Sequence, residues 1–118
     1  MAELRPEGNE LVLHLHALEK AEGFHSDIRV PLSAVTAVRV VDDPWPELRG
    51  LRAPGTGVPD VIAVGTRRGS FGKDFAAVHG TGPAVVVELG GADFARLVVT
   101  SDDAPATAEA IREAAGDG

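Results

Sequence analysis

The residues best suited to do chemistry are five cations between positions 48 and 73: Arg49, Arg52, Arg67, Arg68 and Lys73. Asp60 is the only acidic residue there, so this stretch has a net charge of +4 in a chain whose net charge is −7. Guanidinium groups bind phosphate and carboxylate groups in a bidentate way, and the neighbouring glycines can add backbone N–H donors. The stretch is therefore a candidate site for an anion or an acidic partner. The alternative, which we favour, is that these side chains are solvated or pair with the chain's own acidic residues.

A set of histidines is a second candidate. His14 and His16 are two residues apart in an alternating segment, which places both on one face of a strand, and His25 can lie on the neighbouring strand. Three converging imidazoles can bind zinc or nickel. The alternative is three surface histidines on the polar face of a hairpin, or an interface that responds to pH. We expect neither a metal nor another cofactor.

The single tryptophan, Trp45, lies between two prolines in an irregular stretch. Tryptophan is enriched at the energetic centres of protein interfaces, so Trp45 is a candidate partner-binding residue. The alternative, which we favour slightly, is that Trp45 anchors its loop to the hydrophobic core.

The charge, the cysteine content and the motifs of the sequence disfavour several classes of function. An acidic chain, with a pI near 4.9, disfavours nucleic acid and stable membrane binding. The sequence contains no cysteine, so it has no disulfide framework and no thiolate nucleophile, which fits a cytoplasmic protein. No nucleophile elbow, phosphate loop or metalloprotease motif occurs. We therefore predict that the protein is not an enzyme.

Alternation of apolar and polar residues predicts a mainly β fold. Seven strands are expected, at 11–18, 24–30, 34–41, 61–68, 74–79, 84–89 and 94–100. Residues 1–9 are polar and predict a flexible arm, and 42–60 predict a long loop because four prolines fall within it. Hairpin-length turns indicate an antiparallel sandwich or barrel. The chain then forms one domain over 10–116.

One helix is expected at the C-terminal end, at about 103–115. Asp102 or Asp103 can cap its first turn, where Pro105 is well tolerated. Residues at helical spacing, Ala104, Ala108, Ile111 and Ala115, predict a thin inner face that must lie on a sheet or on a barrel mouth.

The order of these elements resembles the pleckstrin-homology-like fold, in which seven antiparallel strands are closed by one C-terminal helix. The segment Ile28-Arg29-Val30-Pro31-Leu32-Ser33-Ala34-Val35 is similar to the entry into the third strand of bacterial members, and 96–105 is similar to their closing strand, Asp-x-Pro and helix. The resemblance implies a noncatalytic binding or assembly module, often oligomeric. The first two expected strands offer only Lys20 and Arg29 as cations, unlike members that bind lipid headgroups.

We therefore expect a noncatalytic protein-interaction or assembly module, with a protein partner or self-association and an unknown small ligand. The alternative is a small-molecule or anion-binding protein that uses the 48–73 region.

Overall fold

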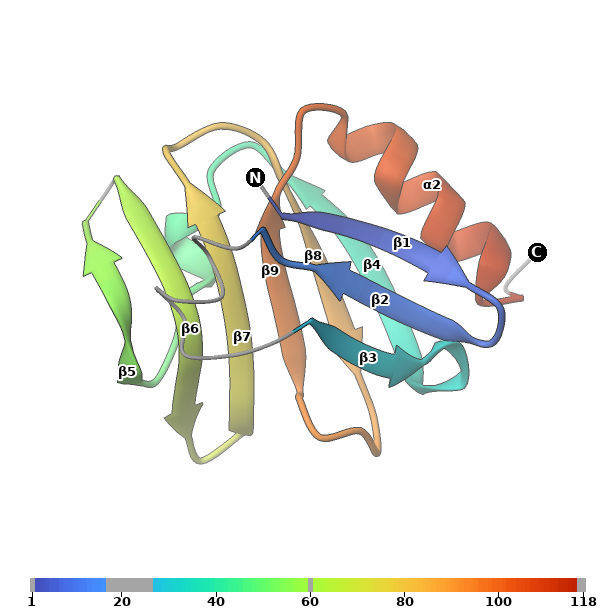
Figure 1. Ribbon diagram of the computed structural model, residues 1–118, viewed down its shortest axis with the longest axis horizontal. Coiled ribbons are helices and arrows are strands. Elements are labelled where there is room, and N and C mark those ends of the chain that lie inside the picture. Colours follow the sequence, from blue (N-terminus) through green and yellow to red (C-terminus); the bar gives the residue numbers. More distant parts are fainter. Residues whose placement is uncertain (1, 17–26, 60, 117–118) are drawn as a thin grey trace.

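A computed structural model describes residues 2–16, 27–59 and 61–116, with the backbone alone described at 52–57. Two β-sheets face each other, and one helix, α2 (Ala104–Ala114), lies beside them (Figure 1). One sheet has three strands in the order β1-β2-β3, and the other has six in the order β4-β8-β9-β7-β6-β5. The predicted mainly β fold with a single C-terminal helix is confirmed for the described residues.

The three-stranded sheet consists of β1 (Glu3–Glu7), β2 (Glu10–His14) and β3 (Ile28–Pro31). β2 pairs antiparallel with both neighbours. Its alternation directs Leu11 and Leu13 into the core. The prediction that 1–9 is a flexible arm is wrong for residues 3–7, because β1 pairs along its whole length with β2. The predicted strand at 24–30 is described only from residue 27 onward.

The six-stranded sheet contains β4 (Val35–Val41), β5 (Leu51–Val58), β6 (Ile62–Gly69), β7 (Gly72–His79), β8 (Ala84–Leu89) and β9 (Arg96–Thr100). Each pair is antiparallel except β7 and β9, which run parallel. This parallel pair arises because β8 passes to the far side of β9. The prediction of seven antiparallel strands is therefore corrected to nine described strands with one parallel pair. No barrel closes in the described part of the chain.

The predicted loop at 42–60 is also corrected, because it contains a 3₁₀ turn, Trp45–Glu47, and the whole of β5. Pro54 falls where the register between β5 and β6 shifts, on the outermost strand of the sheet. A proline can occupy a strand at an edge or a bulge, because no inner hydrogen bond is then lost. The proline content correctly excluded a central strand but could not exclude an edge strand.

The main core lies between the two sheets and α2. Phe75, Leu97 and Ile111 are fully buried there, and the ring of Phe75 meets Phe94 edge to face with centroids 6.0 Å apart. The predicted inner face of α2 is confirmed at three positions, Ala104, Ala108 and Ile111. The predicted cap is also confirmed, because the Asp103 carboxylate accepts a hydrogen bond from the Ala106 N–H. No described helix has the length and apolar character that crossing a membrane requires.

Candidate functional site

The face of the six-stranded sheet that points away from the main core carries a row of charged side chains. Glu88 on β8 lies opposite Arg96 on β9. Arg96 in turn lies opposite Asp74 on β7, and Asp74 lies opposite Arg67 on β6. Because opposite residues in a sheet point to the same face, their charges alternate in sign across four adjacent strands.

Residues 42–50, which we call the 42–50 segment, lie over this face. Trp45 and Leu48 pack on a second apolar cluster, formed by Ala63, Ala76, Val78, Val86 and Val98. The Trp45 indole N–H donates a hydrogen bond of 2.8 Å to the carbonyl of Gly80. The structure therefore gives Trp45 an anchoring position, which is the interpretation that the sequence slightly favoured.

Arg49 reaches from this segment to a buried carboxylate. Its Nε and Nη2 atoms donate to the two oxygens of Asp74 at 2.7 and 3.2 Å, and its guanidinium lies 4.0 Å from the centre of the Phe71 ring. Hydrogen bonding to Asp74 raises the pKa of Arg49. Asp74 is only 2% exposed, and a buried carboxylate requires such a partner. Arg49 is therefore already paired within its own chain.

Two more arginines, on strands of the sheet, donate hydrogen bonds to the backbone of the 42–50 segment. Arg67 donates to the carbonyls of Arg49 and Gly50, at 3.0 and 3.4 Å. Arg96 donates to the carbonyl of Glu47 at 3.0 Å. These contacts satisfy backbone acceptors of the 42–50 segment that the sheet does not pair.

A four-residue ionic network completes the arrangement. Arg39 contacts the carboxylates of Glu47 and Glu88, each at 2.8 Å, and Arg96 contacts Glu88 at 3.0 Å. Burial is the largest single influence on Glu88 and raises its pKa, but the hydrogen bonds from Arg39 and Arg96 together bring that pKa below its ordinary value. The sequence analysis missed this network. Its signal was a charged residue interrupting a β-branched apolar run, as in the segment at 84–89.

Two of the remaining candidate cations, Arg68 on β6 and Lys73 on β7, lie opposite each other in the sheet. Arg68 is exposed on β6, and the Lys73 ammonium lies 4.7 Å from the centre of the Phe94 ring. The side chain of Arg52 lies outside the described residues. The structure thus brings Trp45, Arg49 and Arg67 together through the 42–50 segment, and leaves Arg68 on the surface.

Only His14 and His16 of the three candidate histidines lie among the described residues. The Nε2 atom of His14 contacts Glu7 at 2.5 Å and its Nδ1 atom lies 3.4 Å from Asp27. The hydrogen bond from His14 is the main influence that lowers the pKa of Glu7. His16 lies beyond the end of β2, and His25 lies outside the described residues. No group of three metal-binding side chains occurs among the residues that the structure describes.

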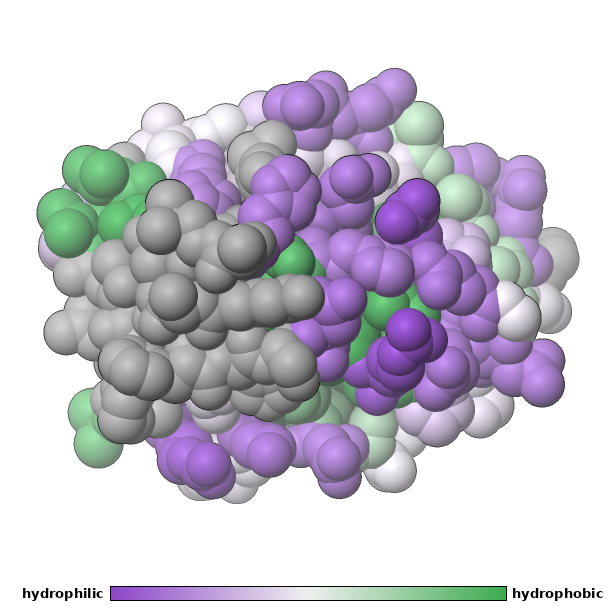
Figure 2. Space-filling model, in the orientation of Figure 1, coloured by the Kyte–Doolittle hydropathy of each residue, from purple (hydrophilic) through white to green (hydrophobic). Residues whose placement is uncertain are grey.

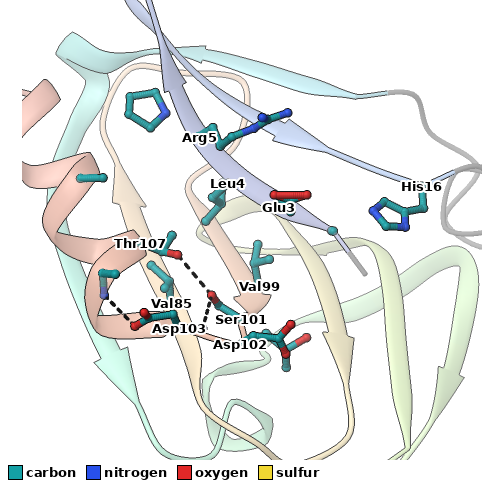
Figure 3. Close-up of a pocket in the computed structure, with 15 residues that line it drawn as sticks. Glu3, Leu4, Arg5, His16, Val85, Val99, Ser101, Asp102, Asp103 and Thr107 are labelled. Atoms are coloured by element: carbon teal, nitrogen blue, oxygen red, sulfur yellow. Dashed lines mark hydrogen bonds between the residues drawn. The ribbon is translucent and has the colours of Figure 1, made fainter.

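A cavity of about 550 Å³ opens between β1 and the first turns of α2 (Figure 3). Leu4, Val85 and Val99 lie at its base, and Ala106 and Ala110 form the side that α2 contributes. Three carboxylates and one guanidinium lie around it: Glu3, Asp102, Asp103 and Arg5. The volume is within the range of ordinary binding pockets. Sequence reasoning did not find this cavity, because its walls come from four separate segments.

The end of the molecule formed by β5 and β6, which we call the β5 end, has the opposite character. Leu51, Val58 and Val61 are 83%, 49% and 59% exposed, and they are three of the four large apolar residues that the described chain exposes. Figure 2 shows hydrophobic residues at the left of the molecule, where Figure 1 places β5. Exposed apolar residues near an open strand edge are a mark of interaction surfaces.

No protein-family model, curated protein or solved structure matches this chain.

Proposed function

We propose that this protein is a noncatalytic protein-interaction module, and that its docking surface is the β5 end. The partner in this proposal is an extended acidic segment of a protein, which adds along the outer edge of β5. Strand addition of this kind obtains affinity from main-chain hydrogen bonds and specificity from alternate side chains.

The observation that carries the proposal is the difference between the two edges of the six-stranded sheet. At the β4 edge, α2 lies against the strand and Arg112 donates a hydrogen bond of 2.7 Å to the carbonyl of Val38. At the β5 edge, no described strand pairs with the outer side of β5. Open edges expose unpaired N–H and C=O groups, which natural proteins usually cover. An open edge that also exposes Leu51 and Val58 is suited to receiving another strand.

Charge defines the partner's chemistry. Arg68 is exposed at this end and supplies a positive charge there. A partner that alternates apolar and acidic residues matches both the exposed apolar side chains and this guanidinium group. Pro54 offers no donor, so the pairing would use the two ends of β5 rather than its centre.

We also propose a relationship to a known fold and a cellular location. A relationship to pleckstrin-homology-like domains is supported by the two facing sheets and the C-terminal helix, and a cytoplasmic location by the absence of cysteine. The alternative function, anion binding at 48–73, would depend on Arg68 and Lys73, because Asp74 already pairs with Arg49.

The test uses two labelled peptides as long as β5, which has eight residues. One alternates valine with glutamate and the other alternates valine with lysine. Fluorescence anisotropy is expected to show binding of the glutamate peptide alone, and this binding should weaken as salt increases. Equal binding of both peptides, or of neither, would overturn the proposal.

Two variants locate the binding. Leu51→Ser removes the apolar side chain at the exposed start of β5 without adding a charge, and should weaken glutamate-peptide binding about tenfold or more, because an apolar contact worth roughly 1.4 kcal/mol or more is lost. Val40→Ser is the matched control, since Val40 is the one large apolar residue exposed elsewhere in the described chain. If Val40→Ser weakens binding as much as Leu51→Ser does, the peptide does not dock at β5.

A further inference from the structure

We propose that the β5 end also binds a second copy of this chain, by docking at the cavity between β1 and α2 of that copy. This inference goes beyond the proposed function, because the contact is made by the projecting Leu51 and Arg68 and not by strand addition along β5. It is a head-to-tail arrangement, in which each copy contributes two different surfaces.

The β5 end presents an apolar projection beside a cation. Leu51 is 83% exposed and lies opposite Arg68 in the pairing of β5 with β6. Gly50 holds this position with a φ of +81°, and a Cβ atom there would lie 2.5 Å from the Arg68 carbonyl oxygen. The backbone before Leu51 is therefore closely fixed against β6, and the leucine points outward from a defined site.

The cavity presents the complementary shape. Ala106 and Ala110 line it from α2, and their small side chains leave the space between helix and β1 unfilled. Both alanines are exposed, although neighbouring positions of the same helix, Ala108 and Ile111, are fully buried. The open volume of about 550 Å³ can receive a leucine together with the aliphatic part of an arginine.

The charges around the cavity are complementary to Arg68. Glu3 and Asp102 are exposed at its rim, and Figure 3 shows them with His16 around the opening. Arg5 is the only lining cation with a permanent charge, and it lies 4.0 Å from Glu7. An arginine that enters this rim therefore meets an excess of carboxylates, to which it can bind in a bidentate way.

The two surfaces lie apart on the molecule. In Figure 1 β5 is at the left, whereas the cavity lies nearer the middle, where β1 and α2 begin. Because the whole chain carries −7, two copies repel in most orientations, and contact of the basic end with the acidic rim is the favourable one. Such contacts produce rings or open chains, because a copy that has bound one partner still has its other surface free.

The experiment is sedimentation of two interface variants, alone and mixed. Leu51→Asp removes the exposed apolar side chain from the β5 end. Ala110→Arg fills the cavity with a large side chain whose charge repels Arg68, and arginine is a good helix former. The wild-type protein is expected to associate increasingly from micromolar to millimolar concentration, and less at high salt. Each variant alone should stay a monomer. The mixture should form one-to-one dimers and nothing larger, because only one productive interface remains.

Two control variants test whether the loss of association is confined to the two proposed surfaces. Val40→Asp and Ala114→Arg alter exposed residues outside both surfaces and should associate like the wild type. A monomeric wild type overturns the inference, and so does a dimer that Leu51→Asp abolishes but Ala110→Arg does not, which would mean symmetric β5 pairing. If the wild type stays monomeric yet still binds the glutamate peptide at β5, the proposed function stands and only the self-association is wrong.

Discussion

Replacing Arg49 by alanine removes the partner of the most deeply buried carboxylate in the described chain. Asp74 is 2% exposed and receives two hydrogen bonds from Arg49. After Arg49→Ala, Asp74 is left as a buried carboxylate that has lost its guanidinium partner. The guanidinium contact with Phe71, 4.0 Å from the ring centre, is lost as well.

The size of the effect follows from burial. Removing one partner of a fully buried ion pair costs about 3–5 kcal/mol of unfolding free energy. The Arg49 side chain is 34% exposed, so water can reach the site, and we take the lower end, about 3 kcal/mol. At about 4 °C per kcal/mol for a domain of this size, the Tm should fall by roughly 12 °C.

Urea unfolding followed by circular dichroism measures this loss, with the m value checked for constancy. Arg68→Ala is the control, because it removes an exposed arginine and should change stability by less than about 0.5 kcal/mol. The double variant Arg49→Ala, Asp74→Ala should recover part of the loss, since no buried carboxylate remains. The reasoning is refuted if Arg49→Ala is no more destabilising than Arg68→Ala.

Three further predictions concern single contacts. Burial is the largest single influence on Glu88 and raises its pKa, but its arginine partners together lower that pKa, so its contribution to stability is full above the unfolded pKa of about 4.3 and is lost as pH falls through the lower folded value. Glu88→Gln should therefore destabilise the protein at pH 7, and the difference from wild type in urea unfolding should shrink progressively as the pH is lowered below about 4.3; a difference that does not change with pH would contradict this. Trp45→Phe loses the hydrogen bond to Gly80 and should cost about 1–2 kcal/mol by urea unfolding, an expectation that an unchanged midpoint would contradict. Asp103→Ala should cost about 1 kcal/mol through loss of the helix cap, measured by thermal unfolding beside Asp102→Ala, which should cost less.

Local patterns predicted the elements whose signals are contiguous in the sequence. The helix was expected at about 103–115 from its composition and apolar spacing and lies at Ala104–Ala114, and its cap, left open between Asp102 and Asp103, is Asp103. The strand at 84–89 followed from its β-branched run, and the strand expected at 94–100 lies at Arg96–Thr100. Such signals depend on a few neighbouring residues and not on the rest of the fold.

Pairing partners distant in sequence could not be predicted in this way. β1 looked polar because only Leu4 and Ala2 enter the core from this segment, and β5 looked like a loop because edge strands tolerate proline. The basic stretch was counted from 48 to 73, one residue short of Asp74, which is the partner of Arg49. The cavity depends on the approach of α2 to β1, which no local pattern encodes.

The most direct test of the central claim is amide hydrogen exchange of β5 with and without the glutamate peptide. The outward N–H groups of an open edge strand exchange quickly, because no neighbouring strand accepts their hydrogen bonds. Our account predicts that the peptide slows exchange at 51–58 and leaves β4 unchanged. Exchange at β5 that stays fast when the peptide is bound, or protection confined to β4, would contradict it.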